Sequence, residues 1–229
     1  LHCHVRAELN EHYGDEVVPS SGALPVHLLG NMWGQSWSNI YDLVYVQPKD
    51  TKTIDITKVI DDLNLSEVEM VEYAEDFFIS IGFKPLPETF WERSLFVKPL
   101  DRSVVCHASA WNVDPAKNDL RITMCIEKNE EDFVTIHHEL GHIFYYQAYN
   151  HLPTLFQGGA NDGFHEAFGD LLSLSITPEY LKKIDFISDE EAEIAEQDPI
   201  GLLMKQALEG VVAIPWTLML DKWRAGVFN

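Results

Sequence analysis

The amino-acid sequence predicts a mainly α-helical protein with one small β element. Apolar residues recur at helical spacing along much of the chain. Four stretches show this most clearly: 66–81, 130–149, 163–176 and 200–220. Only 103–108 and 120–126 have the short apolar, β-branched runs that favour strands. The chain of 229 residues is 46% hydrophobic and 23% charged, which is typical of a protein that buries a core.

The N-terminal quarter combines a helix with a connection rich in Gly, Pro and Ser. Residues 1–12 have the pattern of the end of a helix, and the connection runs from 14 to 25. Trp33, Trp37 and Tyr41 follow at intervals of four, which predicts that they share one helical face and pack in a core.

A polar loop is expected at 48–57, and 54–63 is a short segment whose type the pattern leaves open. Ser66 then begins a helix, because its hydroxyl and Glu69 three residues on make a capping box. Gly82 ends this helix. The expected apolar stripe is Val68, Val71, Ala74, Phe78 and Ile81.

The two strand-like stretches flank a polar turn at 114–119, which predicts a hairpin-like excursion. The helix expected at 130–149 begins with three acidic residues, which suit the positive end of a helix dipole. A Gly-rich loop precedes the helix at 163–176. Residues 189–196 predict a solvated helix face, and 200–220 is again helical.

The charge balance excludes some partners. With 16 Lys and Arg against 37 Asp and Glu, the formal charge is −21 and the pI is about 4.6. Nucleic acids and anionic membranes need a basic surface, so neither is expected. The longest apolar run, Val211–Leu220, contains Pro215 and is well short of the roughly 20 residues that span a bilayer. Both ends look cut from something longer, so the lack of a signal or anchor decides nothing.

Three cysteines are too few for a disulfide scaffold in a chain of this length. Cys106 and Cys125 flank the predicted hairpin, and the residues alone leave open whether they are bonded. Cys3 has no obvious partner. The tripeptide that starts at Asn64 is a glycosylation sequon. Together these features lean towards an extracellular protein.

The chemistry is concentrated in His137-His138-Glu139-Leu140-Gly141-His142. In a helix, His138 and His142 lie about 40° apart, so both imidazoles reach one metal ion. His137 is about 140° out of line with His142 and does not fit. Glu139 sits beside the metal without binding it, where a general base belongs.

Catalytic zinc requires a third protein ligand and an open position. Glu166, in the next predicted helix, is the natural third ligand, although a solvated glutamate is the alternative. Asp170, one turn on, suits a hydrogen bond to a ligand imidazole. His165 lies about 100° round from Glu166 and is assigned to structure.

Four segments resemble the angiotensin-converting enzyme family of peptidyl-dipeptidases. They are HELGH at 138–142, GANDGFHEA at 159–167, HLLGNMWGQ at 27–35 and CHASAW at 106–111. The resemblance extends over nearly the whole chain. It implies a large helical zincin-type metallopeptidase domain, of which 1–229 is the central portion and thus a single partial catalytic domain.

The resemblance also implies roles. Zinc would be bound by His138, His142 and Glu166. Glu139 would be the general base and proton shuttle. Asp170 would not bind the metal but would accept a hydrogen bond from a ligand imidazole.

For the substrate, His107 would contact the peptide near the scissile bond, and the backbone of Ala108 would pair with it as a strand. Gln35 would help to hold the C-terminal carboxylate. Cys106 and Cys125 would form a family disulfide.

The expected activity is therefore zinc-dependent release of C-terminal dipeptides from oligopeptides that have a free carboxylate. Chloride is an expected further cofactor, and most of its ligands would lie outside this chain. A second histidine and the Lys–Tyr pair that binds the substrate carboxylate would also lie outside it. The parent protein is expected to be extracellular, either secreted or anchored through a segment not present here. Three alternatives stay open: an aminopeptidase or thermolysin-like enzyme, a non-catalytic binding homologue, and a fragment without a stable fold.

Overall fold

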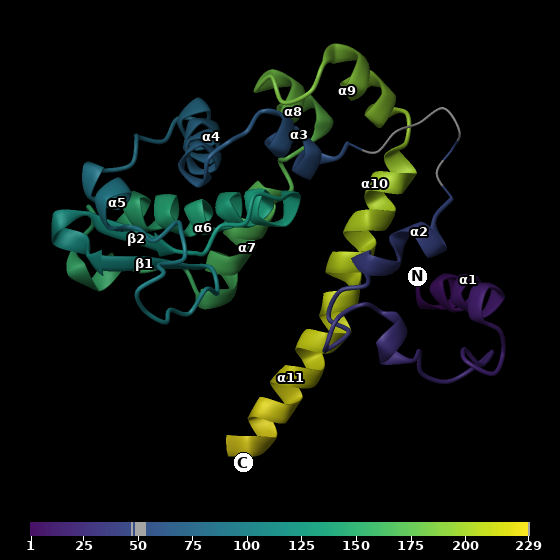
Figure 1. The fold of residues 1–229 in the computed structure, drawn as a ribbon. Coiled ribbons are helices and arrows are strands. Elements are labelled where there is room, and N and C mark those ends of the chain that lie inside the picture. The colour runs from purple at the N-terminus through teal and green to yellow at the C-terminus, as the bar shows by residue number, and fades with distance from the viewer. Residues whose placement is uncertain (47, 49–53, 229) are drawn as a thin grey trace. The chain divides into compact units, whose positions relative to one another are not determined.

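The computed structural model describes residues 1–46, 48 and 54–228 (Figure 1). The chain divides into two compact units. Unit 1 combines Leu1–Thr53 with Glu193–Asn229, and unit 2 is the continuous stretch Ile54–Ala192. The mainly helical fold with a single two-stranded sheet confirms the predicted class. Half of the predicted loop at 48–57, residues 49–53, lies outside the described residues.

Unit 2 is arranged around its longest helix, α6 (Glu130–Tyr149), which contacts α4, α7 and both strands. The other elements of this unit are α3 (Ile56–Asp62), α4 (Glu67–Ser80), α5 (Glu88–Arg93), β1 (Ser109–Asp114), β2 (Asp119–Thr123), α7 (Asp162–Ser173) and α8 (Pro178–Lys183). Aromatic side chains fill the space between α4 and α6, where the rings of Phe78 and Phe144 stack with centroids 4.3 Å apart. This core holds one face of α6 in place, and the polar residues of the helix lie on another face.

Helix α4 starts as predicted. The Ser66 hydroxyl accepts a hydrogen bond from the Glu69 amide, and the Glu69 carboxylate accepts one from the Ser66 amide, which completes the capping box. The buried stripe differs in part, because Met70 is in the core while Val68 and Ile81 are exposed.

The hairpin forms, but its first strand lies later than the sequence predicts. Ser109 pairs with Thr123 and Asp114 with Asp119, so β1 begins after 103–108. Beyond Thr123 the backbone instead bonds to Leu95 and Phe96 on the other edge of β2. The stretch 103–108 thus has no ladder partner among the described residues, and a strand there was the wrong prediction.

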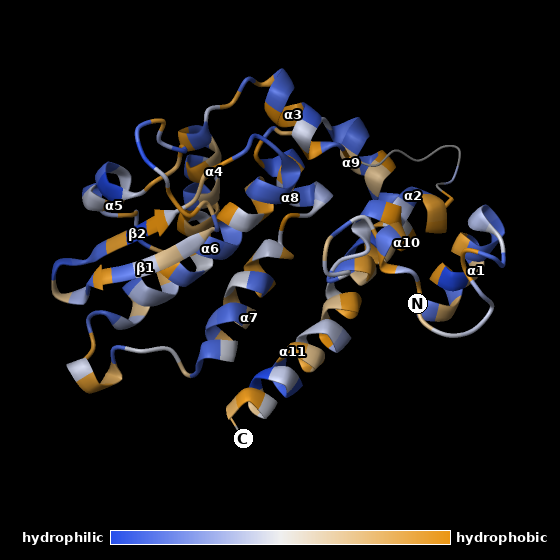
Figure 2. Cartoon of the chain, turned by 60° about the horizontal axis from the view of Figure 1, so that its bottom comes forward, coloured by the Kyte–Doolittle hydropathy of each residue, from blue (hydrophilic) through white to orange (hydrophobic). Residues whose placement is uncertain are grey.

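Unit 1 consists of helices and turns from both ends of the chain. Its elements are α1 (His2–Tyr13), 3-10 turns at Val26–Leu28 and Ser38–Ile40, α2 (Tyr41–Val44), the end of α9 (Asp189–Glu196), α10 (Pro199–Gln206), a π-helical turn at Ala207–Val211, and α11 (Val212–Phe228). A small apolar core collects Val5, Leu9, Val18, Leu29, Ile40, Val44 and Leu208. Figure 2 shows many hydrophobic residues along α11.

The predicted aromatic face around Trp33 is wrong. Only Tyr41 of the three aromatic residues lies in an α-helix, and Trp33 is 63% exposed. Gly30 and Gly34 have positive φ angles of 83° and 63°, which a right-handed helix does not allow, so the segment turns instead of continuing as a helix.

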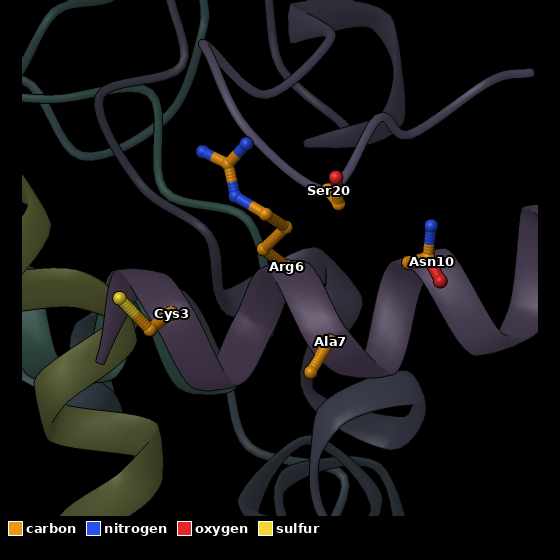
Figure 3. A pocket seen from close by; sticks show the side chains of 5 residues that line it. All are labelled: Cys3, Arg6, Ala7, Asn10 and Ser20. Carbon is orange, nitrogen blue, oxygen red and sulfur yellow. The ribbon is translucent and has the colours of Figure 1, made fainter. Parts of the chain in front are cut away.

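Among the residues that the structure describes, no helix combines the length and apolar character that crossing a bilayer requires. A hollow of about 320 Å³ lies beside α1, lined by the free, exposed Cys3 together with Arg6, Ala7, Asn10 and Ser20 (Figure 3).

Candidate metal centre

Helix α6 presents the two histidines of the HELGH segment on one side. The helix begins at Glu130 because the Asn129 side chain caps it, accepting a hydrogen bond from the Asp132 amide at 2.8 Å. The spacing of four residues brings the Nε2 atoms of His138 and His142 to 3.0 Å from each other. Two imidazoles from one helix thus converge on one point.

Helix α7 supplies the third donor. It starts after Asn161, whose side chain accepts a hydrogen bond from the Phe164 amide at 2.7 Å. Glu166 Oε2 lies 3.2 Å from Nε2 of His138 and 3.4 Å from Nε2 of His142. Of the described residues, these three form the group of His and carboxylate side chains able to hold a metal ion.

The triangle of donors fits zinc. A tetrahedral zinc ion with bonds of about 2.0–2.1 Å needs ligand atoms about 3.3–3.4 Å apart, and the three separations here are 3.0, 3.2 and 3.4 Å. The Glu166 side chain is 65% exposed, so solvent reaches this donor. Two nitrogens, one carboxylate and an open position are the donor set of a catalytic zinc site.

Two glycines allow α6 and α7 to approach each other closely enough. A Cβ atom on Gly141 would lie 2.9 Å from the Cα of Gly169, and one on Gly169 would lie 2.8 Å from Nδ1 of His138. Carbon atoms in contact are normally about 3.5–4.0 Å apart. Neither position therefore accepts a side chain without moving a helix or a ligand.

The remaining ring nitrogens of the ligands also have partners. Nδ1 of His138 lies 3.0 Å from Oδ1 of Asp170, the aspartate that the sequence suggests as a partner of a ligand imidazole. Nδ1 of His142 lies 2.7 Å from Nδ1 of His165, a residue that the sequence assigned to structure. Nothing in the helical spacing of α7 indicates this contact, because it depends on how the two helices cross.

Glu139 is the buried carboxylate beside the three donors. It is 6% exposed, and its Oε2 has no hydrogen-bond partner among the described residues. Burial raises the pKa of Glu139, His138 opposes this shift, Glu166 adds to it and His107 opposes it. An unpaired buried oxygen on a carboxylate of raised pKa is suited to accept a proton near neutral pH.

His137 is a core residue and not part of the centre. It is fully buried, its Nδ1 donates to the Phe133 carbonyl at 2.8 Å, and its Nε2 accepts from the Tyr180 hydroxyl at 3.1 Å. Burial lowers the pKa of His137 to about 4, so the ring is neutral. This position in the core agrees with the helical geometry, which places His137 about 140° out of line with His142.

The residues expected to bind substrate lie at two places. His107 and Ala108 directly precede β1, whose only strand partner in the described part of the chain is β2. Gln35 belongs to unit 1, where its Oε1 is buried without a hydrogen-bond partner among the described residues. Its relation to the metal donors stays a prediction.

Strand β1 is tied to the metal-binding helix. The side chains of Asn112 and Asn150 exchange two hydrogen bonds, at 2.8 and 3.2 Å, and the Tyr146 hydroxyl donates to the Ala110 carbonyl at 3.4 Å. The Cys106–Cys125 disulfide, with Cα atoms 5.0 Å apart, confirms the bond that the resemblance implied and anchors the segment before β1.

Comparison with known proteins agrees with this geometry. The family profile described as angiotensin-converting enzyme matches residues 1–229. The chain is 47% identical over 231 residues to angiotensin-converting enzyme of Bos taurus, and 42% identical over 235 residues to that of Haematobia irritans exigua. It is 42% identical over 230 residues to the angiotensin-converting enzyme-related protein of Drosophila melanogaster.

Each of these alignments includes the whole of the chain but only 17%, 37% and 36% of the respective relative. The chain thus spans well under half the length of the relatives that it matches. The match over every residue, and the identity above 40% along the full chain, establish its ancestry. The chain belongs to the angiotensin-converting enzyme family.

Proposed function

We propose that the protein of which this chain is the central portion is a zinc-dependent peptidyl-dipeptidase, which removes dipeptides from the C-termini of oligopeptides. One observation carries the proposal: three donor atoms at 3.0–3.4 Å from one another stand next to a buried carboxylate that has an unpaired oxygen. Burying an unpaired acidic group costs stability, so such a carboxylate is not expected in a protein that only binds its ligand.

His138, His142 and Glu166 would hold the zinc ion. When bound, zinc polarises the scissile carbonyl and lowers the pKa of water. Glu139 takes a proton from the attacking water and passes it to the leaving amine, which its burial and raised pKa favour. Asp170 orients the His138 ring through the 3.0 Å contact with Nδ1.

The peptide would lie along the edge of β1 that has no strand partner among the described residues. Pairing of its backbone with Ala108 places an extended substrate beside the metal helix, because Tyr146 and the Asn112–Asn150 pair fix β1 to α6. His107 would contact the substrate near the scissile bond. Gln35 would share in holding the C-terminal carboxylate, which measures off the dipeptide. Chloride, with most of its ligands outside this chain, would be a further cofactor.

The parent protein would act outside the cell, secreted or anchored through a segment outside this chain. The disulfide and the sequon at Asn64 support that location, since disulfides persist in oxidising compartments. The isolated chain is expected to cleave peptides poorly, because the donors for the oxyanion and the carboxylate lie elsewhere in the parent.

Zinc content tests the metal site in this chain. We expect one zinc ion per chain, and loss of binding in His138→Ala and Glu166→Ala. Glu190→Ala is the matched control, because Glu190 is an exposed carboxylate of α9 and should leave the zinc content unchanged. A wild-type chain that folds cooperatively without binding zinc would refute the site.

Substrate length and terminus test the activity in the full-length protein. A peptide with a free C-terminus should lose a dipeptide, and the same peptide with an amidated C-terminus should be cut at least tenfold more slowly. Glu139→Gln should retain zinc and lose cleavage. Equal cleavage of the two peptides would instead favour an aminopeptidase or thermolysin-like specificity.

A further inference from the structure

We infer that His165 is a positioning residue that holds the second zinc ligand, His142, in the tautomer and orientation required for metal binding. The inference deepens the proposed zinc site and rests on it. Its basis is the 2.7 Å separation between the Nδ1 atoms of the two rings, the shortest contact that either ligand histidine makes with its surroundings.

The proton positions follow from the geometry. Nε2 of His142 faces the other two donors, at 3.0 Å from His138 and 3.4 Å from Glu166, so its lone pair must point to the metal. A neutral imidazole then has its proton on Nδ1. That proton is donated to Nδ1 of His165, which acts as the acceptor.

The second ring is constrained in turn. Because Nδ1 of His165 accepts, its proton is on Nε2, which lies 3.4 Å from the Tyr149 hydroxyl and donates to it. The result is a chain of hydrogen bonds from the metal donors through two imidazoles to a tyrosine. The ring proton of each imidazole thus has one assigned position.

Aromatic packing fixes the orientation of His165. Its ring lies 4.6 Å from that of Tyr145 and 4.8 Å from that of Tyr146, measured between centroids. A Cβ atom on Gly159 would lie 2.9 Å from Cδ2 of His165, so the Gly-rich loop passes directly over the ring. A ring enclosed in this way makes a rigid acceptor, which a solvated side chain would not.

The two ligand histidines are thus supported differently. His138 lies 3.0 Å from a carboxylate, Asp170, whose side chain is 74% exposed, whereas the more buried His142 donates to a neutral imidazole. Glu139 and Glu166 already place two carboxylates at the centre, and a third beside His142 would be poorly solvated. A neutral acceptor orients the ring without adding negative charge.

Histidine tautomers in the metal-free chain test the inference. Long-range nitrogen–proton NMR at pH 8, with ¹⁵N-labelled histidine, should show His142 with its proton on Nδ1 in the wild type. A through-hydrogen-bond coupling between the two Nδ1 atoms is expected as well. His142 protonated on Nε2 in the wild type, with no such coupling, would overturn the inference without any variant being made.

Variants separate positioning from packing. His165→Leu removes the acceptor, while His165→Asn keeps an oxygen close to the place of Nδ1. In competition with a chelator, zinc should bind His165→Leu about 10–100-fold more weakly, the range seen for residues that orient metal ligands. His165→Asn should recover most of the affinity, and His151→Leu, the same change at an exposed histidine, should have no effect.

The outcomes distinguish this inference from the zinc site itself. A wild-type chain that folds but binds no zinc would refute the zinc site in this chain, yet the tautomer of His142 would still decide the role of His165. Zinc affinity within twofold of wild type in His165→Leu, with the His142 proton still on Nδ1, would show that His165 only fills space.

Discussion

The substitution Gly141→Ala should separate metal affinity from stability. The added Cβ would lie 2.9 Å from the Cα of Gly169, against a normal contact of at least about 3.5 Å, so α6 and α7 must move apart by about 0.6 Å. The atom that it meets belongs to the backbone and has no rotamer that avoids it. Because the donors come from both helices, the separation widens the metal site.

The size of the effect follows from these distances. Moving α7 away by about 0.6 Å takes Glu166 Oε2 from 3.2 Å to about 3.8 Å from Nε2 of His138, beyond the edge of about 3.3–3.4 Å of a zinc tetrahedron. Zinc affinity should fall more than tenfold, the scale seen when the orientation of a ligand is disturbed. Overpacking costs about 1–3 kcal/mol, and alanine regains about 1 kcal/mol of helix propensity, so the stability of the metal-free chain should fall by only about 0–2 kcal/mol.

Chelator competition measures the zinc affinity, and urea unfolding of the metal-free chain measures the stability. Gly226→Ala is the matched control, because Gly226 lies in α11 and nothing is within 4 Å of the place of its Cβ. That variant should gain up to about 1 kcal/mol and bind zinc normally. If Gly141→Ala behaved in the same way, close contact between the helices would not be what builds the site.

Three further predictions concern unit 2. Replacing Cys106 and Cys125 by Ala opens a loop with a sequence separation of 19, and the free energy of unfolding should fall by about 3 kcal/mol; an unchanged urea midpoint would contradict this. Hydrogen bonds from Arg121 and from Arg93 lower the pKa of Asp119 to about 2, so Asp119→Asn should be less stable than wild type at pH 7. This difference in the free energy of unfolding should be at its full size above the unfolded pKa of about 3.8 and shrink as the pH falls towards 2. Urea unfolding at pH 7, 4 and 3 measures it. A difference that grows as the pH falls would contradict the prediction. Ser66→Ala removes the cap of α4 and should lower the free energy of unfolding by about 1 kcal/mol, with faster hydrogen exchange at the first amides of that helix. Unchanged exchange would show that the cap does not stabilise the helix.

The helices that form the metal centre could be predicted because their signals are local. Periodicity and an acidic first turn predicted α6, periodicity predicted α7, and the angle per residue selected His138 over His137 as a ligand. The third donor, Glu166, was expected from its position in the next predicted helix, and the resemblance implied the same role.

The errors arose where distant parts of the chain decide the structure. Spacing by four around Trp33 suggested a helix, but backbone turns at Gly30 and Gly34 prevent it. Residues 103–108 have strand-like composition, yet they do not pair with a strand in the part of the chain that the structure describes. Strand β2 pairs with residues 109–114, and the backbone that follows it bonds to Leu95 and Phe96. The contact of His165 with a ligand depends on the crossing of two helices, which a single sequence does not show.

All three metal donors come from the continuous unit 2, whereas unit 1 is assembled from both ends of the chain. Binding free energy is therefore linked to the unfolding of one unit only. At a zinc concentration 100 times the dissociation constant this linkage adds about 2.7 kcal/mol. In differential scanning calorimetry, zinc should move the melting transition that includes residues 54–192 upwards. The zinc-dependent shift then identifies the heat absorption that belongs to this part of the polypeptide.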